Sequence, residues 1–180
     1  MSSAKSRPRP DRDPIREAHR QWVAHGWSEA ADGMALVTSV VRAQQLLMER
    51  VEGALRPHGL TLARFEVLRL LAFTGAGRLP MTRLGSLLQV HPASVTSAVD
   101  RLEKQGYAAR HRDGRDRRVV LAELTELGRS TVEAATADLN QVFHEPGLPE
   151  DRLHQLTRLL GELRAAAGDP VEDLPGQDDR

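Results

Sequence analysis

One stretch, residues 91–124, constrains the fold of this chain more than any other. It reads HPASVTSAVDRLEKQGYAARHRDGRDRRVVLAEL. Apolar side chains recur in its first part at the i, i+3, i+4, i+7 spacing of one helix face: Val95, Ala98, Val99 and Leu102. Pro92 suits the first helical position, and Gly106 supplies a helix stop. The stretch therefore predicts a helix, a strand, a basic turn and a second strand.

The segment just before this helix predicts a shorter helix, Thr82–Gln89, which Thr82 would cap and whose leucines would face the core. Two short helices joined by a tight turn are the order of a helix-turn-helix, and the basic hairpin adds a wing. A slim helix with small polar side chains can enter a major groove, and a basic hairpin can hold phosphates. The alternative is a solvated helix followed by a charged surface hairpin.

Charge is distributed unevenly, although the formal net charge of the 180 residues is zero. Between Tyr107 and Arg118, five Arg stand against two Asp, whereas residues 169–180 hold five acidic side chains and one Arg. The neutral total therefore conceals a basic wing and an acidic tail. Any polyanion would bind through the wing and not through bulk charge.

The composition excludes several classes of protein. There is no cysteine, so disulfides, thiolate metal sites and thiol-based redox sensing are excluded, which fits a reducing cytoplasm. The sequence shows no signal peptide and no membrane span. Aromatic residues make up only 3% of the chain, so the core must consist mainly of Leu, Val and Ala, a composition that favours helices. We expect a cytoplasmic protein without a membrane partner.

Enzyme motifs are missing from the sequence. None of the seven His pairs with another at the i, i+4 spacing, with Glu, that zinc proteases use. There is no Gly-rich phosphate loop and no Gly-x-Ser-x-Gly elbow. We therefore expect no catalytic residues, no metal and no cofactor.

Taken in order, the chain divides into segments with different roles. Residues 1–13 are predicted to be a disordered arm, residues 14–33 an added N-terminal helix that Asp13 caps, and residues 168–180 an acidic disordered tail. Residues 59–124 form the winged helix-turn-helix lobe, whose first helix Thr61 would cap. Residues 34–58, with a helix over Met34–Leu55, and residues 125–167 carry apolar stripes too broad for one winged-helix core to cover. They predict a partner subunit.

Three motifs together resemble the MarR family of bacterial transcription regulators. They are Asp100-Arg-Leu-Glu103 in the helix, Asp113-Gly-Arg-Asp-Arg-Arg118 in the wing and Leu124-Thr-Glu-Leu-Gly128 after it. The resemblance covers roughly residues 36–163. It implies a mainly α-helical winged helix-turn-helix that forms an obligate homodimer through its first and last helices. The two wings would straddle a palindromic operator.

The added N-terminal helix is similar to the urate-responsive branch of that family. This branch holds its ligand with a Trp of the added helix, an acid after the Phe of the third helix and an Arg of the recognition helix. Trp22 matches the first, Glu66 replaces the usual Asp, and Ala98 stands at the Arg position. The resemblance implies a different small anionic or aromatic effector, in a crevice bordered by Trp22, Arg42, Glu66 and Arg69. The alternative is an internal Glu–Arg pair beneath a packed Trp.

The DNA contacts are predicted from two elements. In the recognition helix they are Ser94, Thr96, Ser97 and Arg101, and in the wing Arg112, Arg115, Arg117 and Arg118. Arg115, at the wing tip, would enter a minor groove, and Asp116 would pair with a neighbouring Arg to hold the turn. The sequence predicts a DNA-binding repressor that a small ligand could release. The alternative is a dimeric winged-helix interaction module without DNA readout, which would have little use for five wing arginines.

Overall fold

The computed structural model describes residues 12–114 and 116–172, which divide into two compact units. The first unit ends at Arg50 and the second begins at Val51. Helices dominate both, and the second unit contains a three-stranded sheet. The predicted fold class, mainly α-helical with a small β wing, is confirmed. Within the described ranges, no helix is long and apolar enough to span a membrane.

The first unit is a pair of helices, α1 (Pro14–Ala24) and α2 (Ser28–Leu55), of which α2 continues into the second unit. Asp13 caps α1 as predicted, because its Oδ1 accepts a hydrogen bond from the Ile15 amide at 3.0 Å. The predicted start of the long helix at Met34 is wrong. The chain turns at Gly26, whose φ of 84° is a left-handed conformation, whereas Gly33 stays helical.

Aromatic and polar contacts join α1 to the start of α2. The rings of Trp22 and Trp27 meet edge to face with centroids 5.4 Å apart, and His25 stacks on Trp27. His19 Nε2 lies 2.9 Å from an Asp32 carboxylate oxygen. Trp22 is half-buried and Trp27 is exposed. The His19–Asp32 pair therefore links α1 to α2, and the tryptophan contact holds the turn between the two helices.

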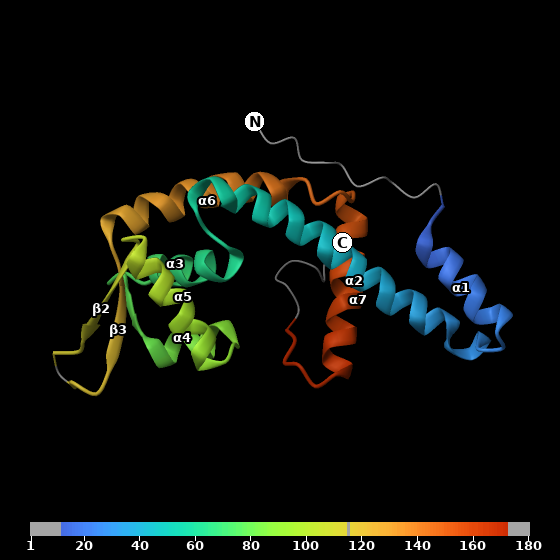
Figure 1. Cartoon of the computed structure of the whole chain (residues 1–180), viewed down its shortest axis with the longest axis horizontal. Coiled ribbons are helices and arrows are strands. Elements are labelled where there is room, and N and C mark those ends of the chain that lie inside the picture. The colour runs from blue at the N-terminus through green and yellow to red at the C-terminus, as the bar shows by residue number, and fades with distance from the viewer. Residues whose placement is uncertain (1–11, 115, 173–180) are drawn as a thin grey trace. The chain divides into compact units, whose positions relative to one another are not determined.

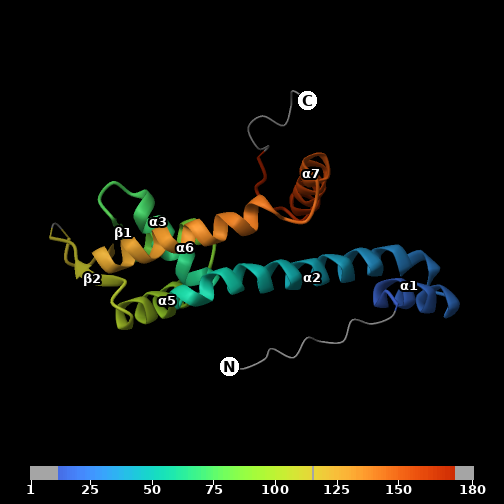
Figure 2. The same ribbon diagram turned by 90° about the horizontal axis from the view of Figure 1, so that it is seen from above.

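The second unit contains the helix-turn-helix. After the end of α2 and a short 3-10 turn, η1 (Arg56–His58), its elements are α3 (Leu62–Phe73), β1 (Arg78–Pro80), α4 (Met81–Leu88), α5 (Pro92–Lys104), β2 (Ala108–Arg112), β3 (Val120–Leu124), α6 (Glu126–His144) and α7 (Glu150–Ala166). Its core is built from aliphatic side chains of α2 to α6, among them Leu55, Leu68, Leu84, Val99, Leu102 and Leu139. Helix α6 runs alongside α3 (Figure 2).

The sheet has the strand order β1-β3-β2, with both pairs antiparallel. Leu79 pairs with Ala122, and Ala108 pairs with Leu124, so the core face of the sheet closes over α3 and α5. Strand β1 adds a third strand to the two that residues 91–124 predict. The hairpin of β2 and β3 projects beyond the cluster of α3, α4 and α5 (Figure 1).

The passage from the wing into α6 explains the Leu-Thr-Glu-Leu-Gly motif. Thr125 Oγ1 accepts a hydrogen bond from the Gly128 amide at 2.9 Å and donates one to the Gly106 carbonyl at 2.7 Å. The Thr125 amide donates to the Tyr107 carbonyl. A Cβ atom on Gly128 would lie only 1.9 Å from that same carbonyl oxygen. Only glycine lets α6 approach the start of β2 this closely.

Two predicted helix caps are wrong. Helix α4 begins at Met81, one residue before Thr82, because Pro80 with φ of −58° ends β1 and leads straight into the helix. Thr61 does precede the first turn of α3, but its side chain caps no amide there. Its hydroxyl instead accepts a hydrogen bond from Arg64 Nε at 3.2 Å.

Candidate DNA-binding surface

The outer face of α5 carries most of the predicted base-contacting residues. Ser94, Ser97 and Arg101 follow the i, i+3, i+7 spacing and are exposed, while the opposite face of α5 is buried in the core. Pro92 occupies the first helical turn as predicted. His91 provides a cap that the sequence did not suggest, because its Nδ1 accepts a hydrogen bond from the Ala93 amide.

The structure separates Thr96 from the other three residues. Ser94, Ser97 and Arg101 line a hollow of about 670 Å³ between α5 and the start of α3. Thr96 lines a smaller hollow of about 350 Å³ against α4, and its hydroxyl donates to the Pro92 carbonyl at 3.1 Å. Thr96 is exposed, but it lies on the other side of the helix.

The described arginines of the wing turn are exposed to solvent. Arg112 at the end of β2 and Arg117 and Arg118 in the turn are all exposed. Arg115 lies outside the described residues, so its predicted place at the wing tip stays a prediction. Asp116 holds the turn through the backbone, because its Oδ1 accepts a hydrogen bond from the Arg118 amide at 2.9 Å.

Arg110 has a different role from the other wing arginines. Its Nη1 lies 2.5 Å from Asp100 Oδ1 and 3.1 Å from Glu103 Oε2, both on α5. Its Nη2 donates to the Thr96 carbonyl at 3.0 Å. Arg110 therefore ties the wing to the recognition helix. Sequence reasoning missed this, although Asp100 and Glu103 at the i, i+3 spacing mark one acidic helix face.

The four predicted effector residues are divided between the two units. Trp22 and Arg42 belong to the first unit, where Trp22 packs on Trp27 and Arg42 Nη1 donates to Gln45 Oε1 at 3.2 Å. Glu66 and Arg69 lie on α3 in the second unit. The contacts of the described residues do not join these four side chains, so the shared crevice stays a prediction.

Arg69 pairs with α6 and not with Glu66. Its Nη2 lies 2.8 Å from Glu133 Oε1, its Nη1 donates to Thr136 Oγ1 at 3.0 Å, and its guanidinium lies over the Phe73 ring. The hydrogen bond and positive charge of Arg69 lower the pKa of Glu133 below its usual value. The described contacts of Arg69 therefore do not form the alternative Glu66 pair beneath a packed Trp, and its ion pair joins α3 to α6 at the surface.

Glu66 makes no ion pair among the described residues. Desolvation of its carboxyl raises its pKa above the usual value, even though the residue as a whole is exposed. One side of the carboxyl group lies against the protein and loses water, which disfavours the charged form and raises the pKa. The rest of the side chain stays in contact with solvent.

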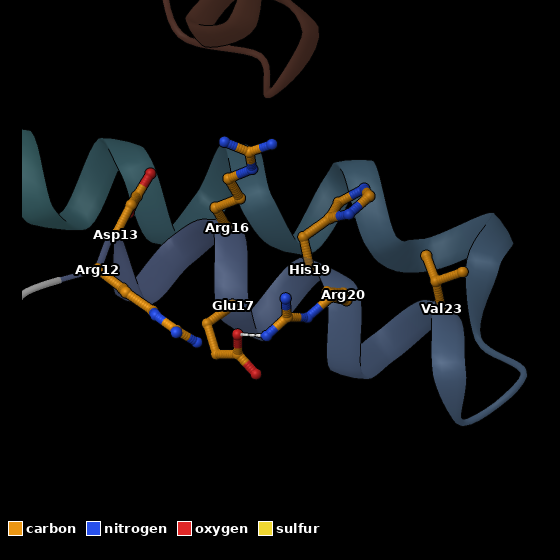
Figure 3. Close-up of a pocket in the computed structure, with 7 residues that line it drawn as sticks. All are labelled: Arg12, Asp13, Arg16, Glu17, His19, Arg20 and Val23. Atoms are coloured by element: carbon orange, nitrogen blue, oxygen red, sulfur yellow. Dashed lines mark hydrogen bonds and ion pairs between the residues drawn. The ribbon is translucent and has the colours of Figure 1, made fainter.

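Another hollow, of about 710 Å³, runs along α1 (Figure 3). Its lining residues are Arg12, Asp13, Arg16, Glu17, His19, Arg20 and Val23. All of them belong to α1 or the two residues before it, and most of the polar groups are already engaged: Asp13 caps the helix, Glu17 pairs with Arg20, and His19 pairs with Asp32. Trp22 is not part of this lining, so the hollow differs from the predicted effector crevice.

The comparisons agree with this geometry. Residues 58–119 match the model of the MarR family. The crystal structure of Sco5413, a MarR family transcriptional regulator from Streptomyces coelicolor, is 42% identical, with a TM-score of 0.68, and the match covers 78% of this chain and 99% of that one. This chain belongs to the MarR family. It is therefore a DNA-binding transcriptional regulator and not an enzyme.

Two further relatives share less sequence identity with this chain. The homoprotocatechuate degradative operon repressor of Escherichia coli is 23% identical, over 81% of this chain and 98% of the relative. A mutant E. coli MarR complexed with operator DNA is 25% identical, with a TM-score of 0.65, over 74% of this chain and 96% of that one. These relatives do not support placing the chain in the urate-responsive branch.

Proposed function

We propose that this MarR family protein is a homodimeric repressor that binds a palindromic operator in the cytoplasm. The main support for this proposal is the contact of Arg110 with Asp100 and Glu103, which fixes the arginine-bearing wing against α5. The exposed hydroxyl face of α5 and the exposed wing arginines thus belong to one rigid surface. Such a surface can place a helix in the major groove and a basic hairpin on the backbone beside it.

The two parts of this surface divide the work. Ser94, Ser97 and Arg101 contact base edges and adjacent phosphates. Thr96 contributes from the flank of α5 that faces α4. Small hydroxyls discriminate weakly between bases, so shape readout by the wing contributes to specificity. Arg112, Arg117 and Arg118 lie near phosphates, and Arg115, whose place rests on the sequence alone, enters the minor groove.

The homodimer is supported by two exposed apolar faces, each described within its own unit. Leu36, Val37, Val40, Val41 and Leu47 are exposed on α2, and Leu156, Leu159, Leu160 and Leu163 are exposed on α7. Apolar faces of this extent mark protein–protein interfaces. A twofold-symmetric dimer would match a palindromic operator.

A small anionic or aromatic effector would release the operator. A crystal structure of a MepR-like protein complexed with pseudoligands is 30% identical to this chain, with a TM-score of 0.56, over 77% of this chain and 96% of that one. A ligand acts only if it prefers the arrangement of the lobes that does not fit DNA. A tenfold loss of affinity needs about 1.4 kcal/mol of such preference.

A mobility-shift experiment tests the proposal. The probe is the region upstream of the protein's own gene, and the control is a scrambled duplex of the same length. We expect preferential binding to the upstream region, protection of an inverted repeat and loss of the preference when one half-site is scrambled. Equal affinity for both duplexes at moderate salt would contradict sequence-specific repression and favour the interaction-module alternative.

A further inference from the structure

The larger hollow beside α5 contains a cation that sequence reasoning did not assign to DNA binding. Besides Ser94, Ser97 and Arg101 of α5, the start of α3 lines it with Thr61, Ala63 and Arg64. Arg64 and Arg101 are its charged residues in the part of the chain that the structure describes, and no described acidic side chain lines it. The hollow therefore combines two guanidinium groups with three hydroxyl groups on the same face that we place against DNA.

Arg64 is held in position by neutral groups. Its Nη1 donates to Gln105 Oε1 at 2.9 Å, and its Nε donates to Thr61 Oγ1 at 3.2 Å. Gln105, which follows the last residue of α5, is itself anchored, because its Nε2 donates to the Gly59 carbonyl at 2.9 Å. The side chain is half-buried and ordered before any ligand arrives, which reduces the entropy that binding would cost.

Arg64 differs from Arg69 and Arg110 in its described partners. Arg69 and Arg110 of the same unit each contact a carboxylate, of Glu133 and of Asp100 respectively. Arg64 contacts no carboxylate among the described residues, and its hydrogen bonds to Thr61 and Gln105 leave its remaining N–H groups without a described acceptor. Guanidinium groups of this kind bind phosphate oxygens well, because their N–H groups form a planar fork that carries charge.

We propose that Arg64 binds a phosphate of the DNA backbone when α5 occupies the major groove. The inference rests on the proposed function, because it requires the outer face of α5 to meet DNA. Phosphates flank the groove that a recognition helix enters, and contacts to them set the register of the protein on the duplex. Thr61 and Gln105 act as positioning residues that aim Arg64 at the backbone. The first helix of the lobe thus contributes to DNA binding directly.

The test compares Arg64→Met with Arg64→Lys and with a control, Arg158→Met. Arg158 is an exposed residue of α7 on the side away from Leu156 and Leu163, so its loss removes the same charge without changing the apolar face that we assign to the dimer. Binding of each full-length variant is measured over a range of salt concentrations, on a duplex that the wild type selects from a random pool and on an unselected random duplex. Thermal melting of each variant checks that it folds.

We expect Arg64→Met to weaken binding to both duplexes by a similar factor, about three- to tenfold, because a phosphate contact carries no sequence information. The slope of log K against log salt should become shallower by about 0.9, the value expected when one phosphate is no longer neutralised. Arg64→Lys should retain most of the slope, and Arg158→Met should match the wild type.

Three results would overturn the inference. Wild-type affinity and slope in Arg64→Met would remove Arg64 from the interface while leaving the proposed function intact. A loss confined to the selected duplex would make Arg64 a base contact. A wild type that enriches no duplex from the random pool and does not bind the random duplex at low salt would overturn the proposed function together with this inference. If Arg64→Met melts well below the wild type, the comparison uses Arg64→Gln instead of Arg64→Met. The amide of the Gln side chain can still donate a hydrogen bond to Thr61 but carries no charge.

Discussion

Arg110 Nη1 of the wing strand β2 lies 2.5 Å from Asp100 Oδ1 of the recognition helix α5. The two side chains are partly exposed, at 26% and 46% of their full accessible surface, so the ion pair contributes little to stability by itself. Its larger effect is geometric, because it holds the wing and α5 at one spacing. That spacing decides whether both can meet the same duplex.

The first prediction separates this geometric role from simple charge. Asp100→Asn removes a negative charge from the DNA-facing lobe, so electrostatics alone would strengthen DNA binding. If the Arg110 contact fixes the wing, Asp100→Asn should instead weaken binding severalfold, while the free energy of unfolding falls by less than about 1 kcal/mol. Mobility shifts and urea denaturation measure the two quantities. Tighter binding by Asp100→Asn would show that the wing holds its position without this pair.

The sequence predicts local structure well because local chemistry determines it. Pro92 and Gly106 mark the two ends of α5 through their own backbones, and the structure confirms both. The predicted start of α2 is too late because Gly26 and Gly33 look alike in sequence, whereas the contacts around the turn, Trp22 with Trp27 and His19 with Asp32, accompany the bend at Gly26.

Contacts between distant residues could not be predicted in the same way. Arg69 and Glu133 are 64 residues apart, and nothing near Arg69 in the sequence distinguishes Glu133 from Glu66 as its partner. Likewise, the sequence groups Arg110 with the other wing arginines, whereas the pairing of β2 with β3 and its contact with α5 turn Arg110 inward. These partners follow from tertiary packing and not from residue spacing.

The second prediction concerns Gly128→Ala. The added Cβ would lie 1.9 Å from the Tyr107 carbonyl oxygen, which belongs to the backbone and cannot rotate away. Overpacking of this kind costs about 1–3 kcal/mol and occasionally more. The matched control is Gly53→Ala in α2, where a Cβ meets nothing within 4 Å and should stabilise the helix by roughly 0.5–1 kcal/mol. Thermal melting should move in opposite directions for the two variants, and equal melting temperatures would contradict the close approach.

The third prediction concerns acid stability. Arg69 lowers the pKa of Glu133 in the folded protein below the usual 4.5. A carboxyl whose pKa is depressed on folding stabilises the folded state above its unfolded pKa, and this stabilisation is lost as the pH falls through the folded pKa. Glu133→Gln should therefore have a lower melting temperature than the wild type at neutral pH. The difference in melting temperature should be small, since Glu133 is exposed, and it should disappear below pH 4.5. A gap independent of pH would exclude this pair as its source.

The fourth prediction concerns the wing tip. Arg115→Ala should weaken operator binding by about 1–3 kcal/mol if this side chain enters the minor groove as the sequence predicts. Replacing an A·T-rich step under the wing by G·C should reduce the affinity of the wild type, because a narrow minor groove attracts the Arg. On that altered operator, the wild type and Arg115→Ala should bind with nearly the same affinity. Unchanged affinity of Arg115→Ala at moderate salt would remove Arg115 from the interface.

The last prediction concerns assembly. Leu156 and Leu159 of α7 are exposed at 44% and 48% in the single chain, next to further exposed leucines of the same helix. If this face is covered by a second copy, Leu156→Asp or Leu159→Asp places a charge inside an apolar interface, where it has no partner. An obligate dimer often has no stable folded monomer, so these variants should melt at lower temperature and yield aggregate or unfolded chain in light scattering. His154→Asp, on the other side of α7 and exposed, introduces the same side chain and should remain a folded dimer. A well-folded monomer of Leu159→Asp would contradict an obligate dimer, since it would show that one chain alone tolerates the uncovered face.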